Sequence, residues 1–366
     1  MLILKIHEFL IAKNTPKDRI MKDLKYLLAY AIPITAVIGL YFGSYWAFFT
    51  PVFAFVLMPV FEILLPIRAS NLNKEEIISK TGDKFFNWLL YLNAPLVLGI
   101  VGYYLWSLNQ ISYSTFELIG LTSSVGIVVG SNGINVAHEL GHRQLQFEKT
   151  LGKLLLLPAL YMHFFIEHNF GHHQNAATTE DPASANYNQS VYSFWFTSII
   201  RQYSSAWKIQ GDLLKREGRP FFSVKNDMMW YVIFQLAYLF TIHFWLGGLS
   251  VLIALFIAVS GVLLLETINY IEHYGLRRNK TKSGRYKRVT EIHSWNSNHV
   301  LGRVMLYELT RHSDHHYRSN KKYQLLDYHI ISPQMPYGYP TSMVLSLFPP
   351  LWFKIMNKNI PQEMKD

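Results

Sequence analysis

The sequence predicts an all-α membrane protein, a six-transmembrane-helix bundle with a cytoplasmic cap, built as a single membrane-embedded domain over residues 1–366. Half of the residues are hydrophobic, and apolar runs long enough to cross a bilayer recur along the chain. The connections between these runs alternate between charged and uncharged segments. Because Lys and Arg collect on the cytoplasmic side of a membrane, this alternation predicts a side for each connection.

The apolar runs divide the chain into five sections. These are a basic N-terminal interfacial segment at 1–25, spans one to four within 26–137, a polar cytoplasmic section at 138–227, spans five and six within 228–268, and a cytoplasmic cap at 269–366. The runs themselves are 27–42, 45–65, 88–106, 116–138, 228–245 and 249–268. Residues 151–165 are apolar but too short and too interrupted by proline for a span, so we expect an interfacial or re-entrant helix there.

The charges predict which connections face the cytoplasm. Uncharged connections occur at 43–46, at 107–115 and at Gly247-Gly248, whereas Lys and Arg are dense at 68–84 and 277–288. The positive-inside rule therefore puts both termini in the cytoplasm and predicts a multi-pass protein of the inner membrane. No Ala-x-Ala-like cleavage site follows residues 1–13, so we expect a short surface helix there and not a removable signal.

Composition limits the chemistry. The net charge of +10 is explained by the bases of cytoplasmic loops, with an acidic partner as the alternative; we expect contact with membrane lipid and with no nucleic acid. Cysteine is absent, which excludes disulfides, thiolate-bound haem, cysteine-ligated iron–sulfur clusters and thiol nucleophiles. No strand-Gly-x-Gly-x-x-Gly-helix unit is present, so we expect no flavin or nicotinamide site. Electrons for any redox reaction would come from another protein.

Histidines gather in three clusters and at the end of the last apolar run, on the predicted cytoplasmic side. The nine are His138, His142, His168, His172, His173, His273, His312, His315 and His316. Residues four apart share a helix face, so His138 is expected to pair with His142 and His168 with His172, while His173 lies about 100° round from His172 and can reach a second ion. Spacings of three and four place the last cluster on one face. Nine rings exceed what one ion accepts, so they predict a di-metal site.

The residues themselves leave the metal open, because imidazole suits iron, zinc, copper and nickel. We expect the other histidines to be structural: His7, His163, His243, His293, His299 and His329. Carboxylates adjoin each cluster, and we expect several of them to orient metal-bound rings, with solvation of helix ends as the alternative: Glu139, Glu167, Asp181, Glu272 and Asp314. Glu272 is the best candidate for a closer role, since it precedes His273 at the end of a span.

Two other functions fit part of the pattern. His138-Glu139-x-x-His142 matches the zinc metalloprotease signature, but a protease needs only one further ligand and leaves seven clustered histidines unexplained. A histidine-rich metal transporter would place its site near the middle of the bilayer, whereas these clusters lie at its predicted cytoplasmic edge.

The motifs resemble those of the integral-membrane alkane monooxygenases, a branch of the desaturase-like di-iron membrane enzymes. The three clusters and the element Asn269-Tyr270-Ile271-Glu272-His273-Tyr274-Gly275-Leu276 all match, and the resemblance covers residues 116–316. The last cluster is usually preceded by Leu-Gln-Arg, and here it reads Leu309-Thr310-Arg311. This departure lies outside the predicted ligands.

The resemblance implies two non-haem iron ions ligated by the nine histidines alone, with Glu272, Asp314 and either Glu139 or Glu167 steering the rings. It implies O₂-dependent hydroxylation of a medium-chain n-alkane to the 1-alkanol, with electrons from rubredoxin that is itself reduced by rubredoxin reductase. Arg277 to Arg288 would dock an acidic rubredoxin. A related hydroxylase or desaturase acting on an aromatic methyl group or a fatty acyl chain is the alternative. An alkane has no group for hydrogen bonding, so a narrow channel would select the position that reacts.

Overall fold

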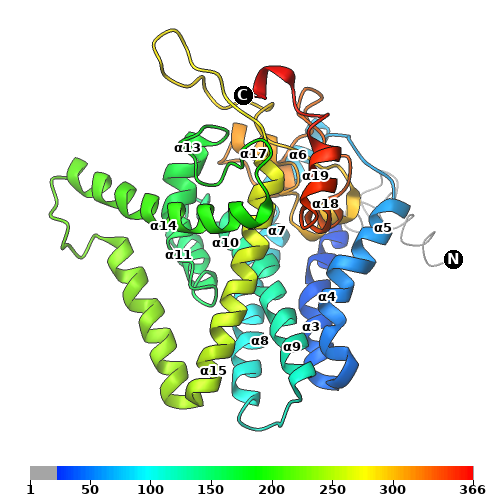
Figure 1. Cartoon of the computed structure of the whole chain (residues 1–366), viewed down its shortest axis with the longest axis vertical. Helices are drawn as coiled ribbons and strands as arrows, with labels where there is room; N and C mark the ends of the chain where they lie inside the picture. Colours follow the sequence, from blue (N-terminus) through cyan, green and yellow to red (C-terminus); the bar gives the residue numbers. More distant parts are fainter. Residues whose placement is uncertain (1–22, 366) are drawn as a thin grey trace.

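The computed structural model describes residues 23–365, and the regular secondary structure of this part of the chain is helical apart from three isolated β-bridges. Five helical stretches are long and apolar enough to cross a membrane: Lys25–Phe42, Ser44–Leu64, Lys84–Ser107, Thr115–Gly141 and Asp227–His273. Their lower parts fill the lower half of Figure 1, while α5 (Met58–Leu64), α7 (Lys84–Tyr91), α10 (Asn135–Gly141) and the end of α15 (Asp227–His273) reach its middle or above. Many of their aromatic and aliphatic side chains are exposed, as expected for helices that face lipid. The predicted surface helix at 1–13 lies outside the described residues.

Most of the membrane stretches combine several helical segments. Their bounds are η1 Lys25–Tyr30 and α3 Ala31–Phe42; η2 Ser44–Phe48, α4 Phe49–Val52, η3 Phe53–Leu57 and α5 Met58–Leu64; α7 Lys84–Tyr91 and α8 Asn93–Ser107; and α9 Thr115–Val128, η4 Val129–Ile134 and α10 Asn135–Gly141. Segments η3 and η4 are π-helical, so the helix register shifts within two of the stretches.

The fifth stretch, α15 (Asp227–His273), contains both of the last two apolar runs. Gly247 interrupts its helical geometry with φ 81° and ψ 175°, a left-handed backbone that glycine adopts without steric cost. Figure 1 shows two arms of α15 that meet at the bottom of the view. Five membrane-length helices are therefore found where six separate spans were predicted, because helical geometry resumes directly after Gly247.

Two helices join the membrane stretches on the side of the histidines. α11 (Gln146–Leu155) ends well before the next short helix, α12 (Phe164–Ile166), so the apolar segment 151–165 forms no spanning helix in the structure. α14 (Val191–Arg216) buries one side chain per turn and packs against α15. Its buried residues include Phe194, Ser198, Gln202, Ala206 and Gln210.

The remaining chain forms a cap over one end of the bundle (Figure 1). Its helices are α16 Val300–Met305, α17 His312–Tyr317, η6 Tyr323–Leu325, α18 Tyr339–Ser346, α19 Pro349–Met356 and η7 Gln362–Met364, and α6 Lys74–Thr81 joins them. Buried aromatic rings of the cap pack on the end of α15, among them Trp352 against Tyr270 and Tyr274. The cap therefore closes over the point where α15 delivers His273.

Helices α9 and α15 approach closely because small residues lie where they cross. A β-carbon at Gly126 would overlap the side chain of Ser260, and one at Gly130 would lie 2.6 Å from Cδ2 of Leu264. On the facing helix, a β-carbon at Gly261 would lie 3.0 Å from Cγ1 of Val129. Gly126 and Gly130, four residues apart, thus form a small-residue face that allows close helix packing.

Replacing Gly126 with alanine should separate these helices and lower the free energy of unfolding by about 1–3 kcal/mol, the usual cost of an overpacked core. The measurement is thermal unfolding of the detergent-purified protein, followed by size-exclusion chromatography. Gly99→Ala is the matched control, since a β-carbon there meets nothing within 4 Å. Equal melting temperatures for the two variants would contradict the close crossing.

Candidate metal centre

Four parts of the chain deliver the nine clustered histidines to one place. α10 carries His138, with His142 directly after its end. The π-helical segment η5 (Glu167–His172) and the short α13 (His173–Asn175) follow one another, and α15 ends at His273. The cap helix α17 contributes the last three. In Figure 1, α10, α13, α17 and the end of α15 lie together above the bundle.

The nine rings form two groups in which the ligand atoms lie within 4.8 Å of one another. The five-histidine group is His138, His142, His168, His173 and His315. The four-histidine group is His172, His273, His312 and His316. The groups are neighbours, because the ring centroids of His173 and His316 are 4.6 Å apart.

The π-helix decides which histidine of the second cluster joins which group. The backbone of η5 is π-helical, with hydrogen bonds from residue i to residue i+5, and this wider turn places His168 with His173 while His172 joins the other group. The predicted pairing of His168 with His172 is therefore wrong. In α17, His312 and His316 share a group but His315 points to the other, so the expected single face of this cluster is wrong too.

The contacts between the rings suit a shared cation. In the five-histidine group the Nε2 atoms of His142, His168 and His173 lie 3.0–3.1 Å from one another. A neutral ring nitrogen carries either a proton or a lone pair, so three such atoms cannot all pair by hydrogen bonds. Atoms at this spacing can all lie about 2.1 Å from one ion, a usual metal–imidazole distance. His138 and His315 are buried, and neither ring nitrogen has a hydrogen-bond partner among the described residues.

The four-histidine group has the same character. The Nε2 atom of His316 lies 3.1 Å from Nε2 of His172 and 2.9 Å from Nε2 of His312. The Nε2 atoms of His312 and His273 are 3.2 Å apart. All four rings are buried. The residues present therefore fit two ions, one in each group.

Burial favours the neutral form of most of these rings, the form in which imidazole binds a metal. It lowers the pKa of His142 to about 3, with His172 and Arg143 adding to the effect. Burial and then the neighbouring imidazoles also lower the pKa of other rings well below the usual range: His168, His173, His312, His315 and His316.

Asp181 orients a ring of the four-histidine group. Its Oδ2 lies 3.0 Å from Nδ1 of His172 and also accepts a 2.5 Å hydrogen bond from Ser184. Burial works to raise the pKa of Asp181, but the charge and hydrogen bond of His172 outweigh it and the pKa is lowered. This is the carboxylate–histidine pairing that fixes the tautomer of metal-bound rings.

Glu272 also lies at the four-histidine group. Its Oε2 is 3.2 Å from Nε2 of His312, and its Oε1 accepts a 2.9 Å hydrogen bond from the hydroxyl of Tyr339. The carboxylate thus faces the ring nitrogen that the other histidines surround. Sequence reasoning missed Tyr339, because no spacing relates a cap residue to the end of α15.

The other three carboxylates face away from the rings. Glu139 pairs with Arg143 at 2.8 Å, and Asp314 binds Lys321 and His329, each at 2.7 Å. Burial, followed by the nearby Asp181 and Glu266 carboxyl groups, raises the pKa of Glu167 well above its usual range. No ring contact links Glu139, Glu167 or Asp314 to the nine histidines among the described interactions.

The histidines outside the clusters have other surroundings. His163 packs between Tyr161 and Tyr203, and His299 lies 3.0 Å from the hydroxyl of Ser297. His293 accepts a hydrogen bond from the Thr290 amide. His243 is exposed on α15, His329 contacts Asp314, and His7 lies outside the described residues.

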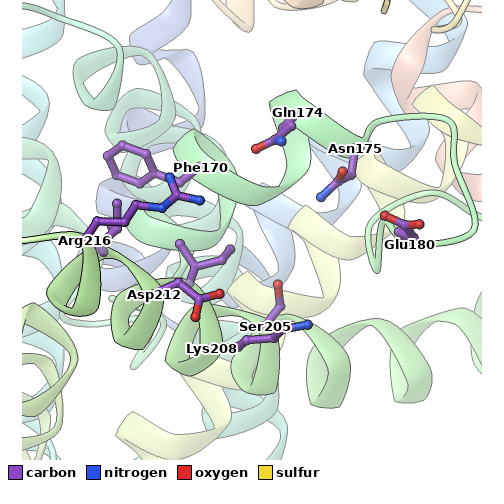
Figure 2. A pocket seen from close by; sticks show the side chains of 10 residues that line it. Phe170, Gln174, Asn175, Glu180, Ser205, Lys208, Asp212 and Arg216 are labelled. Atoms are coloured by element: carbon purple, nitrogen blue, oxygen red, sulfur yellow. The ribbon is translucent and has the colours of Figure 1, made fainter. Parts of the chain in front are cut away.

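Two polar hollows reach the histidines. One, of about 470 Å³, includes His142 together with Arg143, Lys149 and Lys153 in its lining. A second, of about 650 Å³, includes His173 and His316, and we call it the basic hollow because of Arg278, Arg285, Lys287 and Arg288 in its wall. Figure 2 shows a third, about 510 Å³, between α14 and the segment 170–175; it carries charges of both signs and none of the nine histidines.

An apolar cavity of about 50 Å³ lies between the bundle and the cap. It is lined by Ile32, Ala54, Phe55, Met58, Ile127, Ser131, Leu264, Ile268, Met305, Leu306, Pro340 and Met343. Phe55 lines this cavity, whereas Phe53, two residues before it, does not, and Trp88 is exposed on α7.

Comparison with known proteins gives the family. Residues 114–345 match the fatty acid desaturase family model. The chain is 35% identical to alkane 1-monooxygenase 2 of Alcanivorax borkumensis, over 95% of this chain and 94% of that protein. It is also 35% identical to alkane 1-monooxygenase 2 of Pseudomonas aeruginosa, over 88% and 86% of the two chains. Identity to the xylene/toluene monooxygenase hydroxylase component of Pseudomonas putida is 28%, over 92% and 89%.

These similarities extend over nearly the whole chain and include the segments that carry all nine histidines. They confirm the resemblance that the histidine clusters and the Asn269–Leu276 element indicated. The chain belongs to the alkane 1-monooxygenase family.

Proposed function

We propose that this protein hydroxylates the terminal methyl group of medium-chain n-alkanes. One atom of O₂ enters the C–H bond to give the 1-alkanol, and the other leaves as water with two electrons and two protons. The observation that carries the proposal is the meeting of nine imidazoles, in groups of five and four, at the end of an apolar bundle. The family membership gives this site its reaction class.

We assign two iron ions to the two histidine groups. When bound, these irons would supply the reduction and activation of O₂. The chain's own residues hold them and set their surroundings: the nine rings bind, Asp181 fixes the tautomer of His172, and Glu272 with Tyr339 supports the four-histidine group. The placement of Glu139, Glu167 and Asp314 favours a structural role for each.

The apolar cavity is the proposed site for the end of the alkane. Its lining offers almost no hydrogen-bonding group, which suits a substrate that has none. Shape alone must then select the carbon that reacts, since a hydrophobic site discriminates weakly by contact energy. The runner-up substrate, an aromatic methyl group, is suggested by the more distant xylene/toluene monooxygenase relative.

Rubredoxin, reduced by rubredoxin reductase, is the proposed electron donor, and the basic hollow is its proposed docking site. Arg277 and Arg278 are unsuited to docking, because their guanidinium groups bind Asn186 and the carbonyls of Leu276, Gln174 and Lys287. The exposed bases of the same loop remain: Lys280, Lys282, Arg285, Lys287 and Arg288. An acidic donor seated there would lie against His173 and His316.

We further propose six spans, counting the two arms of α15 separately, with the histidines on the cytoplasmic side of the inner membrane. Charge supports this orientation, because the connection 68–84 and the loop 277–288 on the histidine side are basic, while the opposite connections carry no charge.

The assignment of the reaction is tested by offering octane, xylene and a fatty acid side by side to the purified protein with reduced rubredoxin. We expect 1-octanol as the main product, because the residues that line the apolar cavity include no cationic side chain to pair with a carboxylate. Gas chromatography with mass spectrometry identifies the products. Preferred oxidation of xylene, or desaturation of the fatty acid, would contradict the assignment of an alkane as the substrate.

Removing one ring from either group should halve the metal content. Elemental analysis of His142→Ala and His316→Ala should give about one iron per chain instead of about two, with loss of alcohol formation. His243→Ala is the matched control, because this exposed histidine lies outside both groups and should keep both irons. A single iron in the unaltered protein would contradict the two-site assignment.

Neutralising the basic hollow should weaken donor binding without changing the chemical step. In the triple variant Arg285→Gln, Lys287→Gln, Arg288→Gln we expect the KM for rubredoxin to rise about tenfold at low salt, while kcat at saturating donor is unchanged. The dependence of KM on ionic strength should also weaken. Lys84→Gln, an exposed base on another connection, serves as the control; an unchanged KM in the triple variant would refute docking here.

A further inference from the structure

Glu62 is a buried carboxyl group that the proposed chemistry does not use. It lies near the end of α5, is 2% exposed, and neither side-chain oxygen has a hydrogen-bonding side chain as partner among the described residues. An ionisable residue in a membrane-spanning helix is costly and usually serves a function. The question is therefore what its carboxyl group holds in place.

The carboxyl group lies against two glycines from different parts of the cap. A β-carbon at Gly302 would lie 2.6 Å from Oε1 of Glu62, and a β-carbon at Gly338 would overlap the carboxyl group itself. All three nearest atoms at Gly338 belong to Glu62. Only glycine at these two positions lets the carboxyl group approach both backbones.

Each glycine is at the start of a helix that lacks a cap of its own. Gly302 is in the first turn of α16, and Gly338 is the N-cap residue of α18; neither helix has a side-chain cap hydrogen bond. The first amide groups of a helix have no partner within it, and a carboxylate near them is stabilising. The Glu62 side chain, which belongs to the membrane bundle, thus contacts the N-terminal ends of two cap helices, α16 and α18.

Both helices lead to parts of the proposed site. Met305 of α16 and Pro340 and Met343 of α18 line the apolar cavity. Tyr339, the first residue of α18, donates to Glu272, which lies 3.2 Å from His312. A shift of α18 would therefore change the cavity wall and the hydrogen bond to Glu272 together.

We propose that Glu62 is a positioning residue that joins α16 and α18 to the membrane bundle and so sets both the cavity and the Tyr339–Glu272 contact. Its role in product selectivity rests on the proposed alkane hydroxylation, whereas its role in holding the two helices does not. The two parts are tested by separate measurements.

The structural part is tested by a double-mutant cycle in thermal unfolding with Glu62→Ala, Gly338→Ala and the pair. Gly338→Ala alone should be strongly destabilising, because its methyl group meets Glu62. In the Glu62→Ala background the same methyl group has space, so the added change should cost little. Strict additivity of the two substitutions would overturn the proposed contact, whichever reaction the protein catalyses.

The functional part is tested with Glu62→Gln, which keeps the size of the side chain and is expected to fold. We expect the ratio of 1-octanol to 2-octanol to fall about fivefold, a change that corresponds to about 1 kcal/mol. Full iron content with an altered optical spectrum of the metal centre should accompany it. Glu217→Gln, at an exposed position directly after α14, should change neither the ratio nor the spectrum.

The outcomes are distinguishable. An unchanged product ratio and spectrum in Glu62→Gln would overturn the positioning role while leaving the alkane assignment intact. Absence of alkane hydroxylation in the unaltered protein would overturn the proposed function, and the double-mutant cycle and the spectrum would still decide the role of Glu62.

Discussion

The structure depends on gathering nine imidazoles in a space from which water is largely excluded. Each buried ring nitrogen without a partner costs about 1–3 kcal/mol, and His138 and His315 have no partner at either nitrogen. Such a cluster is stable only when something compensates for these losses. A cation shared among the Nε2 atoms does so for a whole group at once, which hydrogen bonds between the rings cannot.

The membrane bundle positions this cluster through the ends of two helices. α9 continues through η4 into α10 and His138, while the second arm of α15 ends at His273. Where these helices cross, Gly126, Gly130 and Gly261 allow the backbones to approach closely. The distance between His138 and His273 therefore depends on how α9 and α15 pack in the apolar interior, and not only on contacts at the metal centre itself. The cap then adds three further rings and closes over them.

The class of fold and the nine histidines of the two groups could be predicted from the sequence, since apolar length, loop charge and clustering are local signals. Which rings belong to which group could not be predicted from the sequence. Helix periodicity of 3.6 residues predicted that His168 pairs with His172, but η5 is π-helical and pairs His168 with His173. A π-helix depends on tertiary packing and leaves no spacing signal in the residues themselves.

Contacts between distant segments were equally out of reach. Asp314 directly precedes the ligand His315 in sequence yet binds Lys321 and His329, whereas Asp181, eight residues beyond its cluster's last ligand, contacts His172. Neighbours along a helix point in different directions, so sequence proximity is a poor guide to which carboxylate reaches a ring. Tyr339 and Glu62 make their contacts across the interface between cap and bundle. These contacts join segments far apart in the sequence, so no local pattern predicts them.

The two histidine groups are unequal, and this inequality has a chemical consequence. The four-histidine group is fully buried and has both carboxylate contacts, from Asp181 and Glu272. The five-histidine group includes the partly exposed His142 and His173, which line the two polar hollows. A carboxylate that contacts a metal-bound imidazole raises the basicity of the ring, and burial lowers the local dielectric constant. Two irons held here would therefore differ in reduction potential, with the five-histidine site more open to water and the four-histidine site more strongly defined by the protein.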